Sequence, residues 1–354
     1  MIQSILSSFL WHGTLDNASE KVAWDSLCYP KSEGGLGIRG LSTWNIVFGI
    51  KLIWMLYFRA GSIWVAWVRD KYLSAGSFWS LNSRNYSISW TFRRLLKLRH
   101  IALSFLRISV QEGGETYFWV YPWMLFGVLI DYLGTSGPMD LGIPLNSLVS
   151  SITQGSAWIL RPARSERQLN LHVYLTSFSH SPGSDAGFWK VGDTIGDKFS
   201  TKEVWKFIRM AKPSVSWARF IWNQAIRTKY RITSWLFTLN RNPTMDRLIL
   251  WGLDLENCCL LCGNAPESRD HLFFLCSYSS LVWKAVIRVL GFTNPPLHWE
   301  SVLEWFVSAG FNQIQLAASS LAWVYIYMIW QERNTRYHDG LTKSHWMLSR
   351  EVIK

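Results

Sequence analysis

The chain has 354 residues, 49% of them hydrophobic and 23 of them tryptophan, so it can bury enough apolar surface to fold, and wholesale disorder is excluded. Lysine and arginine number 36 against 24 aspartate and glutamate residues. The resulting net charge of +12 favours a polyanion partner, usually nucleic acid, although it decides nothing about fold.

Targeting and membrane signals are weak in this sequence. The first residues carry no basic region ahead of an apolar stretch, so we expect no signal peptide. The most apolar run, residues 316–330, is shorter than the roughly twenty residues that a membrane-spanning helix needs. Four of the five cysteines cluster near residue 270 and Cys28 stands alone, which fits a metal site in a reducing compartment. We therefore expect an intracellular protein, nuclear or cytoplasmic, without a membrane partner.

Residues 1–110 are predicted to be helical. An apolar run opens the chain, and a glycine-rich loop over 33–38 follows, whose spacing matches no dinucleotide or phosphate-loop fingerprint. Apolar residues then recur at three- and four-residue steps over 41–73, with Gly61-Ser62 separating two helices. Arg93, Arg94, Lys97 and Arg99 form a basic cluster that faces either phosphate or solvent.

Residues 111–198 change character, and we expect short strands and loops that link two helical parts. Gly113 to Trp119 is typical of a turn followed by a short strand, and residues 185–199 repeat this pattern. Helices are predicted again over 201–211, 216–226, 229–239 and 243–252, then from Ser277 to Gly291, and finally over 299–309 and 312–336. The predicted fold class is therefore mainly α, with a domain over 199–292 and C-terminal helices over 293–354.

The most specific signal is a C-x2-C-x8-H-x4-C pattern formed by Cys259, Cys262, His271 and Cys276. Three thiolates and one imidazole suit a four-coordinate zinc site. Gly263 follows the first pair, as a turn with an unusual backbone angle would require. His271 and Cys276 would point roughly 140° apart on a continuous α-helix, so we expect the chain to bend between them. Four protein ligands leave no position for an activated water, so the predicted zinc ion is structural.

Two alternatives to this zinc site remain open at the sequence level. Free buried cysteines pack as small apolar residues, which would explain the cluster without a metal. Cys258 could also replace Cys259 as a ligand, although a Cys258-x3-Cys262 pair would make a looser loop.

Basic residues precede the cysteine cluster. The candidate nucleic-acid contacts are Arg227, Lys229, Arg231, Arg241 and Arg247. Trp222, Tyr230, Trp235 and Phe237 are interleaved with them. Cations bind phosphate and exposed rings stack bases, but large aromatic side chains are more often buried, and we expect that for these four.

The motif set resembles the zinc-binding domain of plant reverse transcriptases from LINE-type non-LTR retrotransposons. Its parts are Phe199-Ser200-x-Lys202-x-Val204-Trp205, Trp235-Leu236, Thr244-x-Asp246-Arg247-Leu248, the Cys/His pattern itself and Val282-Trp283. Upstream segments within 9–37 and Trp330-x-Glu332-Arg333-Asn334 agree, so the resemblance covers roughly residues 5–340.

The resemblance implies a C-terminal piece of a retroelement protein, in which residues 1–110 are a connector that follows the polymerase. No Asp-Asp pair of the polymerase palm occurs in the sequence, and a ribonuclease H domain has no room before Lys354. We therefore expect no catalytic residues, no small-molecule substrate and no enzyme activity of the chain alone. The expected function is a structural-zinc module that binds RNA or DNA. The alternatives are a protein-interaction or relic helical fragment, or an accessory part of a polymerase encoded in the same element.

Overall fold

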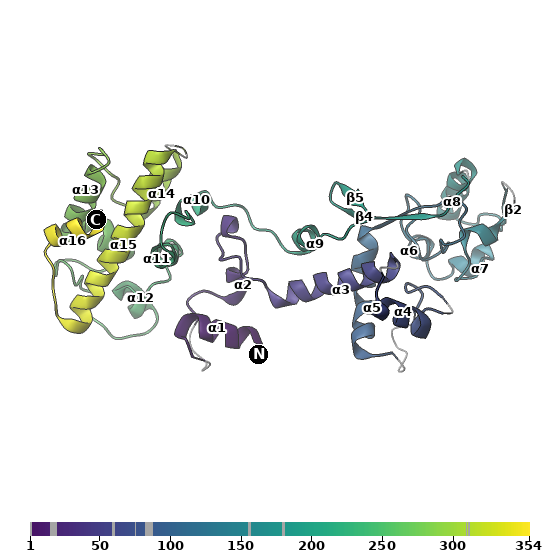
Figure 1. Ribbon diagram of the computed structural model, residues 1–354, viewed down its shortest axis with the longest axis horizontal. Coiled ribbons are helices and arrows are strands. Elements are labelled where there is room, and N and C mark those ends of the chain that lie inside the picture. Colours follow the sequence, from purple (N-terminus) through teal and green to yellow (C-terminus); the bar gives the residue numbers. More distant parts are fainter. Residues whose placement is uncertain are drawn as a thin grey trace. The chain divides into compact units, whose positions relative to one another are not determined.

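Buried side chains in the computed structural model gather into two hydrophobic cores, each within its own unit of the chain (Figure 1). Residues 1–39 and 211–354 form one unit, here called the terminal unit, and residues 40–210 form the other, here called the middle unit. The structure describes residues 2–14, 20–58, 61–74, 76–81, 88–154, 157–178, 181–308, 310 and 312–354. Parts of the predicted helical segment 1–110 therefore lie outside the described residues.

The terminal unit is built from helices. They are α1 (Ile2–His12), α2 (Trp24–Leu27), η1 (Lys31–Glu33), α10 (Ala218–Ile221), α11 (Thr228–Thr238), α12 (Met245–Leu250), η3 (His271–Leu275), α13 (Ser277–Arg288), α14 (Trp299–Ser308), α15 (Gln313–Asp339) and α16 (His345–Ile353). The long helix α15 is the centre of this unit, because α10, α11, α13, α14, α16 and η3 all pack against it.

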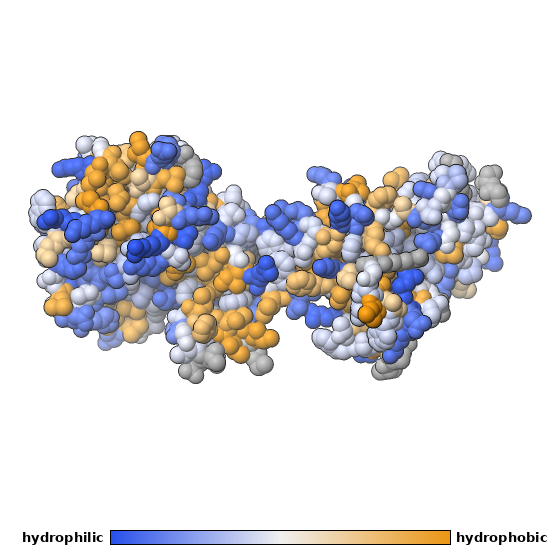
Figure 2. Space-filling model, in the orientation of Figure 1, coloured by the Kyte–Doolittle hydropathy of each residue, from blue (hydrophilic) through white to orange (hydrophobic). Residues whose placement is uncertain are grey.

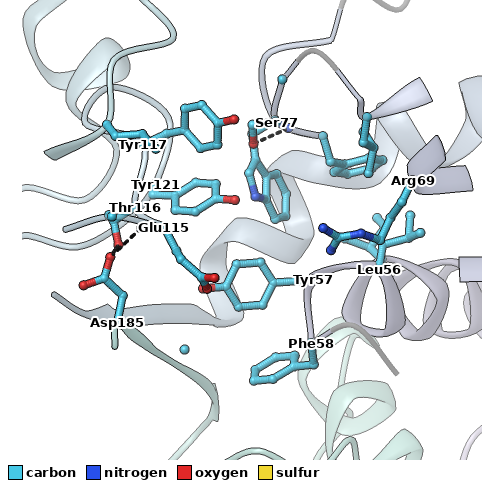
Figure 3. Close-up of a pocket in the computed structure, with 18 residues that line it drawn as sticks. Leu56, Tyr57, Phe58, Arg69, Ser77, Glu115, Thr116, Tyr117, Tyr121 and Asp185 are labelled. Atoms are coloured by element: carbon cyan, nitrogen blue, oxygen red, sulfur yellow. Dashed lines mark hydrogen bonds between the residues drawn. The ribbon is translucent and has the colours of Figure 1, made fainter. Parts of the chain in front are cut away.

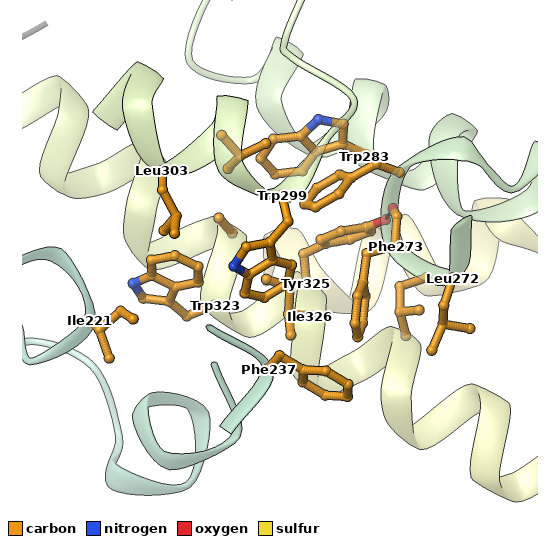
Figure 4. Packing of buried hydrophobic residues seen from close by; sticks show 14 of the residues in the cluster. Ile221, Phe237, Leu272, Phe273, Trp283, Trp299, Leu303, Trp323, Tyr325 and Ile326 are labelled. Atoms are coloured by element: carbon orange, nitrogen blue, oxygen red, sulfur yellow. Dashed lines mark hydrogen bonds between the residues drawn. The ribbon is translucent and has the colours of Figure 1, made fainter. Parts of the chain in front are cut away.

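Tryptophan side chains join the segments of the terminal unit. Figure 4 shows Trp283, Trp299 and Trp323 beside Phe273 and Tyr325 in one aromatic cluster. The indole N–H of Trp323 on α15 donates to the carbonyl oxygen of Phe220 at 2.9 Å, and that of Trp283 donates to Pro296 at 3.0 Å. The Trp283 and Trp323 rings therefore bury large apolar areas while their polar atoms stay hydrogen-bonded, which explains part of the high tryptophan content.

The middle unit combines helices with small antiparallel sheets. Its helices are α3 (Leu41–Tyr57), α4 (Ile63–Tyr72), α5 (Trp90–Phe105), α6 (Leu129–Leu133), α7 (Gly137–Leu141), η2 (Val149–Ile152), α8 (Glu166–Ser177) and α9 (Thr201–Ile208). Its strands are β1 (Leu106–Ser109), β2 (Thr153–Gln154), β3 (Ala157–Trp158), β4 (Ala186–Val191) and β5 (Thr194–Gly196). One sheet has the order β1-β4-β5, with Leu106 opposite Trp189 and Trp189 opposite Gly196, and β2 pairs with β3.

The predicted fold class, mainly α, is confirmed. Several details were wrong. The short helices α6 and α7 lie in the stretch expected to form strands and loops, and the helix predicted over 216–226 is limited to α10. Residues 166–177, expected among strands and loops, form α8, whose capping residue Ser165 accepts a hydrogen bond from the Gln168 N–H. Gly113 to Trp119 forms a loop with one isolated bridge at Tyr117 instead of a strand. The helix α16 follows the predicted last helix and packs on α13. The four predicted segments are defined by sequence motifs, whereas the two units are defined by contacts in the structure. The division into four segments therefore stays a proposal.

Helix α1 presents apolar side chains to the surface, and Figure 2 shows hydrophobic colour gathered over it. Its exposed apolar residues are Ile2, Ile5, Leu6, Phe9 and Leu10. Within the described part of the chain, none of the helices combines the length and the apolar character needed to cross a bilayer.

Candidate metal centre

The four predicted ligand side chains converge in the terminal unit. The ligand atoms of Cys259, Cys262, His271 and Cys276 all lie within 4.8 Å of one another. The Sγ atoms of Cys259 and Cys276 are 3.9 Å apart, and the Sγ of Cys262 is 3.3 Å from Nε2 of His271. Tetrahedral zinc with ordinary bond lengths would separate two sulfurs by about 3.8 Å, and a sulfur from a nitrogen by about 3.6 Å. The set therefore fits one zinc ion, and the sulfur separation is far beyond the roughly 2.05 Å of a disulfide.

A tight turn presents the first pair of cysteines. The Gly263 N–H donates to the Cys259 carbonyl at 2.8 Å, and the Cys259 N–H donates to Ala265 at 2.8 Å. Gly263 has a φ of +68°, in the left-handed region that glycine adopts without strain. The backbone N–H groups of Leu261 and Cys262 donate to the Cys259 sulfur. Such donors stabilise a thiolate, so the turn suits a metal-bound sulfur.

The second pair uses a π-helical turn. In η3 the Cys276 N–H donates to the His271 carbonyl at 2.8 Å, a bond that spans five residues where an α-helix spans four. Cys276 then adopts extended angles, φ −62° and ψ 135°, before α13 begins. The predicted bend between His271 and Cys276 is present. The wider turn and the extended residue together return the sulfur to the histidine ring.

Electrostatics favour a thiolate at Cys276. A hydrogen bond from the Cys259 thiol lowers the pKa of the Cys276 thiol, with help from the N–H groups of Ser279 and Tyr278, although burial opposes the shift. The same hydrogen bond and burial raise the pKa of the Cys259 thiol. Zinc binds thiolates, so a bound metal would displace the protons that these sulfurs hold.

Helix α15 supports the cysteine turn through hydrogen bonds and ion pairs. Nη1 of Arg336 donates to the Leu261 carbonyl at 2.9 Å, and its Nε lies 2.9 Å from Oε1 of Glu332, whose side chain is 2% exposed. One turn away, Arg333 pairs with Glu267 in the loop between Cys262 and His271. Glu332 and Arg333 belong to the motifs that carry the family resemblance, but the sequence predicted no role for them. The supporting roles of Glu267 and Arg336 were not predicted either.

The structure places Cys259 with the other three ligands and leaves Cys258 outside the cluster. Cys258 is half-buried, and its backbone N–H donates to Glu256 at 2.9 Å. Among the described residues this cluster contains all the predicted ligands and no additional Asp, Glu, His or Cys side chain.

The predicted basic residues do not form one compact group. Arg227 precedes α11, Lys229 and Arg231 lie in its first turn, and Arg241 follows its end. A helix of this length spans about 16 Å, so Arg241 lies far from the other three. Lys229 and Arg231 point roughly 160° apart around the helix axis. The sequence cluster therefore divides into separate surface positions.

Aromatic burial follows the expectation in part. Trp235 and Phe237 are fully buried, while Trp222 and Tyr230 are half-buried. Sequence reasoning missed Trp251, which is 50% exposed and lies directly after α12. The Arg247 guanidinium lies 5.4 Å from the centroid of the Trp251 ring. Arg247 is half-buried beside the exposed Trp251 ring, and the pair has the composition of a single-strand contact site.

Comparisons with known proteins agree with the metal-site geometry. Residues 199–283 match the family described as zinc-binding in reverse transcriptase. The chain is 22% identical over 326 residues to the Arabidopsis thaliana protein named "Putative ribonuclease H protein", covering 86% of this chain and 50% of that protein. The chain thus spans about half the length of this relative. No solved structure matches the chain.

Proposed function

We propose that the terminal unit is a structural-zinc module that binds single-stranded RNA or DNA and forms part of a LINE-type retrotransposon protein. The observation that carries the proposal is the convergence of three sulfurs and one imidazole within 4.8 Å, in a segment that matches a zinc-binding family of reverse transcriptases. When bound, zinc supplies a crosslink between the cysteine turn and η3, with no open position for a reacting water.

The cysteine loop is connected to a surface that suits nucleic acid. Oε1 of Glu267 accepts the N–H of Met245 at 3.0 Å, and the Glu267 carbonyl accepts the N–H of Asp246 at 3.3 Å. Both N–H groups belong to the first turn of α12, where N–H groups have no acceptor within the helix itself. Helix α12 in turn carries Arg247 beside Trp251. Ordering the loop therefore orders the cation–aromatic pair.

Each side chain of this pair has a defined role in the proposal. Arg247 contacts phosphate, and the exposed face of Trp251 stacks on a base without regard to sequence. Lys229 offers a second contact of the same kind, because its Nζ lies 4.7 Å from the Tyr327 ring and 5.0 Å from the Tyr230 ring. The chain's net charge of +12 adds attraction to any polyanion.

Fluorescence anisotropy with zinc-loaded protein and labelled single-stranded RNA and DNA tests the proposal. Trp251→Ala should weaken binding by about 5- to 100-fold, the range expected for one lost stacking contact. Trp346→Ala is the matched control, because Trp346 is 70% exposed on α16. Binding should also weaken steeply with salt, by a slope of about −0.7 per phosphate contact.

Equal affinities of the two tryptophan variants, or binding without a salt slope, would contradict this function. A chain that needs zinc to fold but binds no nucleic acid would favour the alternative, a protein-interaction fragment. Enhanced activity of a separate retroelement polymerase on addition of the chain would favour the accessory role.

A further inference from the structure

A cavity of about 470 Å³ lies in the middle unit, which contains none of the four cysteine-cluster ligands. Its walls come from α3, α4, residues 76–79, residues 114–121 and β4 (Figure 3). The volume lies within the range of about 300–1,000 Å³ that is typical of small-molecule sites. The cavity plays no part in the function proposed for the terminal unit.

Three phenol rings form one side of the cavity. Figure 3 shows Tyr57, Tyr117 and Tyr121 pointing into the same space. The Tyr121 ring centroid is 5.9 Å from that of Tyr57 and 5.4 Å from that of Tyr117. Gly187 on β4 makes room for this arrangement, since a Cβ atom at that position would collide with the Tyr57 ring. The wall therefore presents aromatic ring surface to a ligand.

A buried donor in the cavity wall has no partner. Trp79 lines the cavity and is 6% exposed, yet its indole Nε1 lacks a hydrogen-bond partner among the described residues. Arg99 fixes the backbone here, donating to the carbonyls of Trp79 at 3.1 Å and Leu81 at 2.7 Å. An unsatisfied buried N–H is costly, so this one points to an acceptor on a ligand.

Charged groups complete the lining. Figure 3 shows the Arg69 guanidinium directed toward the cavity from α4, with the Glu115 carboxylate near the Tyr57 ring. The Asp185 carboxylate is already committed to structure, because it accepts hydrogen bonds from the backbone N–H groups of Gln111, Gly113 and Glu115, and from the Thr116 hydroxyl. Asp185 therefore holds the segment that carries Glu115 and Tyr117 in a fixed shape.

The lining selects a class of ligand. An aliphatic molecule would leave the Trp79 N–H and the Arg69 guanidinium unpaired, and Arg69 disfavours a quaternary ammonium group that the aromatic rings alone would accept. A nucleobase satisfies every feature, because it is flat, carries both hydrogen-bond acceptors and N–H donors, and is attached to phosphate. The middle unit also has 18 lysine and arginine residues against 10 aspartate and glutamate residues. We propose that this cavity binds one unpaired nucleobase, either of a free nucleotide or of a single strand.

Isothermal titration of the full chain with guanosine and uridine monophosphates tests the proposal, with ribose 5-phosphate as the ligand that lacks a base. Trp79→Phe keeps most of the ring but removes the N–H, and should weaken nucleotide binding about tenfold, the effect of one lost hydrogen bond to a desolvated acceptor. Arg69→Gln should weaken it further. Trp90→Phe is the control, because Trp90 is 72% exposed in the same unit. Circular dichroism checks that each variant is folded.

A second arm identifies the source of the base. A single-stranded octamer with a central 2-aminopurine should lose fluorescence on binding, and Trp79→Phe should reduce that loss, if the cavity takes a base from a strand. If free nucleotide binds saturably but the octamer binds without a change in 2-aminopurine fluorescence, the cavity is assigned to free nucleotides. Equal binding of ribose 5-phosphate and nucleotides, equal affinities of the Trp79→Phe and Trp90→Phe variants, or an absence of saturable nucleotide binding would overturn the proposal. Trp251→Ala should leave the mononucleotide titration unchanged, so failure of the cavity proposal is distinct from failure of the terminal-unit function.

Discussion

Arg333 on α15 forms an ion pair with Glu267, a fully buried carboxylate in the loop between Cys262 and His271. Nη2 of Arg333 is 3.0 Å from Oε1 of Glu267, and Nε is 3.2 Å from both carboxylate oxygens. The two side chains are 5% and 0% exposed. Glu267 also accepts the first N–H of α12, so one ion pair joins α15, the metal loop and the helix that carries Arg247.

Replacement of Arg333 by methionine should strongly destabilise the terminal unit. The substitution leaves the Glu267 carboxylate buried without a counter-charge, which typically costs about 3–5 kcal/mol. Guanidinium unfolding followed by tryptophan fluorescence at fixed zinc concentration measures the change. Arg350→Met on α16 removes an exposed guanidinium and serves as the control. Equal midpoints for both variants would show that the pair contributes nothing to stability.

Replacement of Arg336 by glutamine should weaken zinc binding. Arg336 holds the Leu261 carbonyl between Cys259 and Cys262, and loss of a group that orients metal ligands typically costs about tenfold or more in affinity. Competition with a chromophoric chelator at constant pH measures the zinc dissociation constant. Lys284→Gln removes one exposed positive charge from α13 and is the matched control. An affinity unchanged from wild type would mean that the turn keeps its shape without α15.

The metal centre shows how far sequence reasoning reaches. The ligand spacing predicted the residues that converge, and the five-residue interval from His271 to Cys276 predicted that the chain bends. The sequence did not reveal that Arg333 and Arg336 on α15 support this loop, because their partners lie more than sixty residues away in the chain. Pairings across such separations depend on how the helices pack, which local spacing does not encode.

Asp185 should make the middle unit sensitive to acid. Burial alone would raise the pKa of its carboxyl, but hydrogen bonds from Gln111, Thr116, Gly113 and Glu115 outweigh burial and hold that pKa below the usual 3.8. A carboxyl with a lowered folded-state pKa stabilises the fold above its ordinary pKa, and this contribution disappears as the pH falls through the folded-state value. Asp185→Asn should therefore destabilise the middle unit near neutral pH and flatten its stability profile below about pH 4.

Hydrogen exchange of the Gln111 and Gly113 amides measures the local stability that Asp185 provides, since both amides donate to its carboxylate. Both amides should exchange faster in Asp185→Asn at neutral pH. Asp193→Asn, at an exposed position beyond β4, is the control and should leave their exchange unchanged. Equal protection of these amides in both variants would contradict the role assigned to Asp185.

The middle unit shows where sequence patterns were insufficient. Asp185 and Thr116 are far apart in the chain, and a lone aspartate near glycines is typical of an ordinary turn. Helix α8 was missed because its apolar residues, Leu171 and Leu175 among them, lie between segments rich in glycine and proline that favoured loops. The helices α3 and α4, by contrast, followed from the three- and four-residue spacing of their apolar residues. That spacing did not identify the buried face, because Phe48, Ile63 and Trp67 are exposed while Val47, Ile50 and Val65 are buried.

Zinc stoichiometry is the most direct test of the central claim, that Cys259, Cys262, His271 and Cys276 hold one structural zinc ion. Native mass spectrometry of the wild type, Cys259→Ser and Cys258→Ser should show one zinc in the wild type and in Cys258→Ser, and loss of that zinc in Cys259→Ser. Circular dichroism of Cys259→Ser should show a parallel loss of helicity, because the metal joins η3 and α13 to the cysteine turn. A wild-type chain without zinc, or a Cys259→Ser variant that retains its zinc and its helicity, would contradict the account.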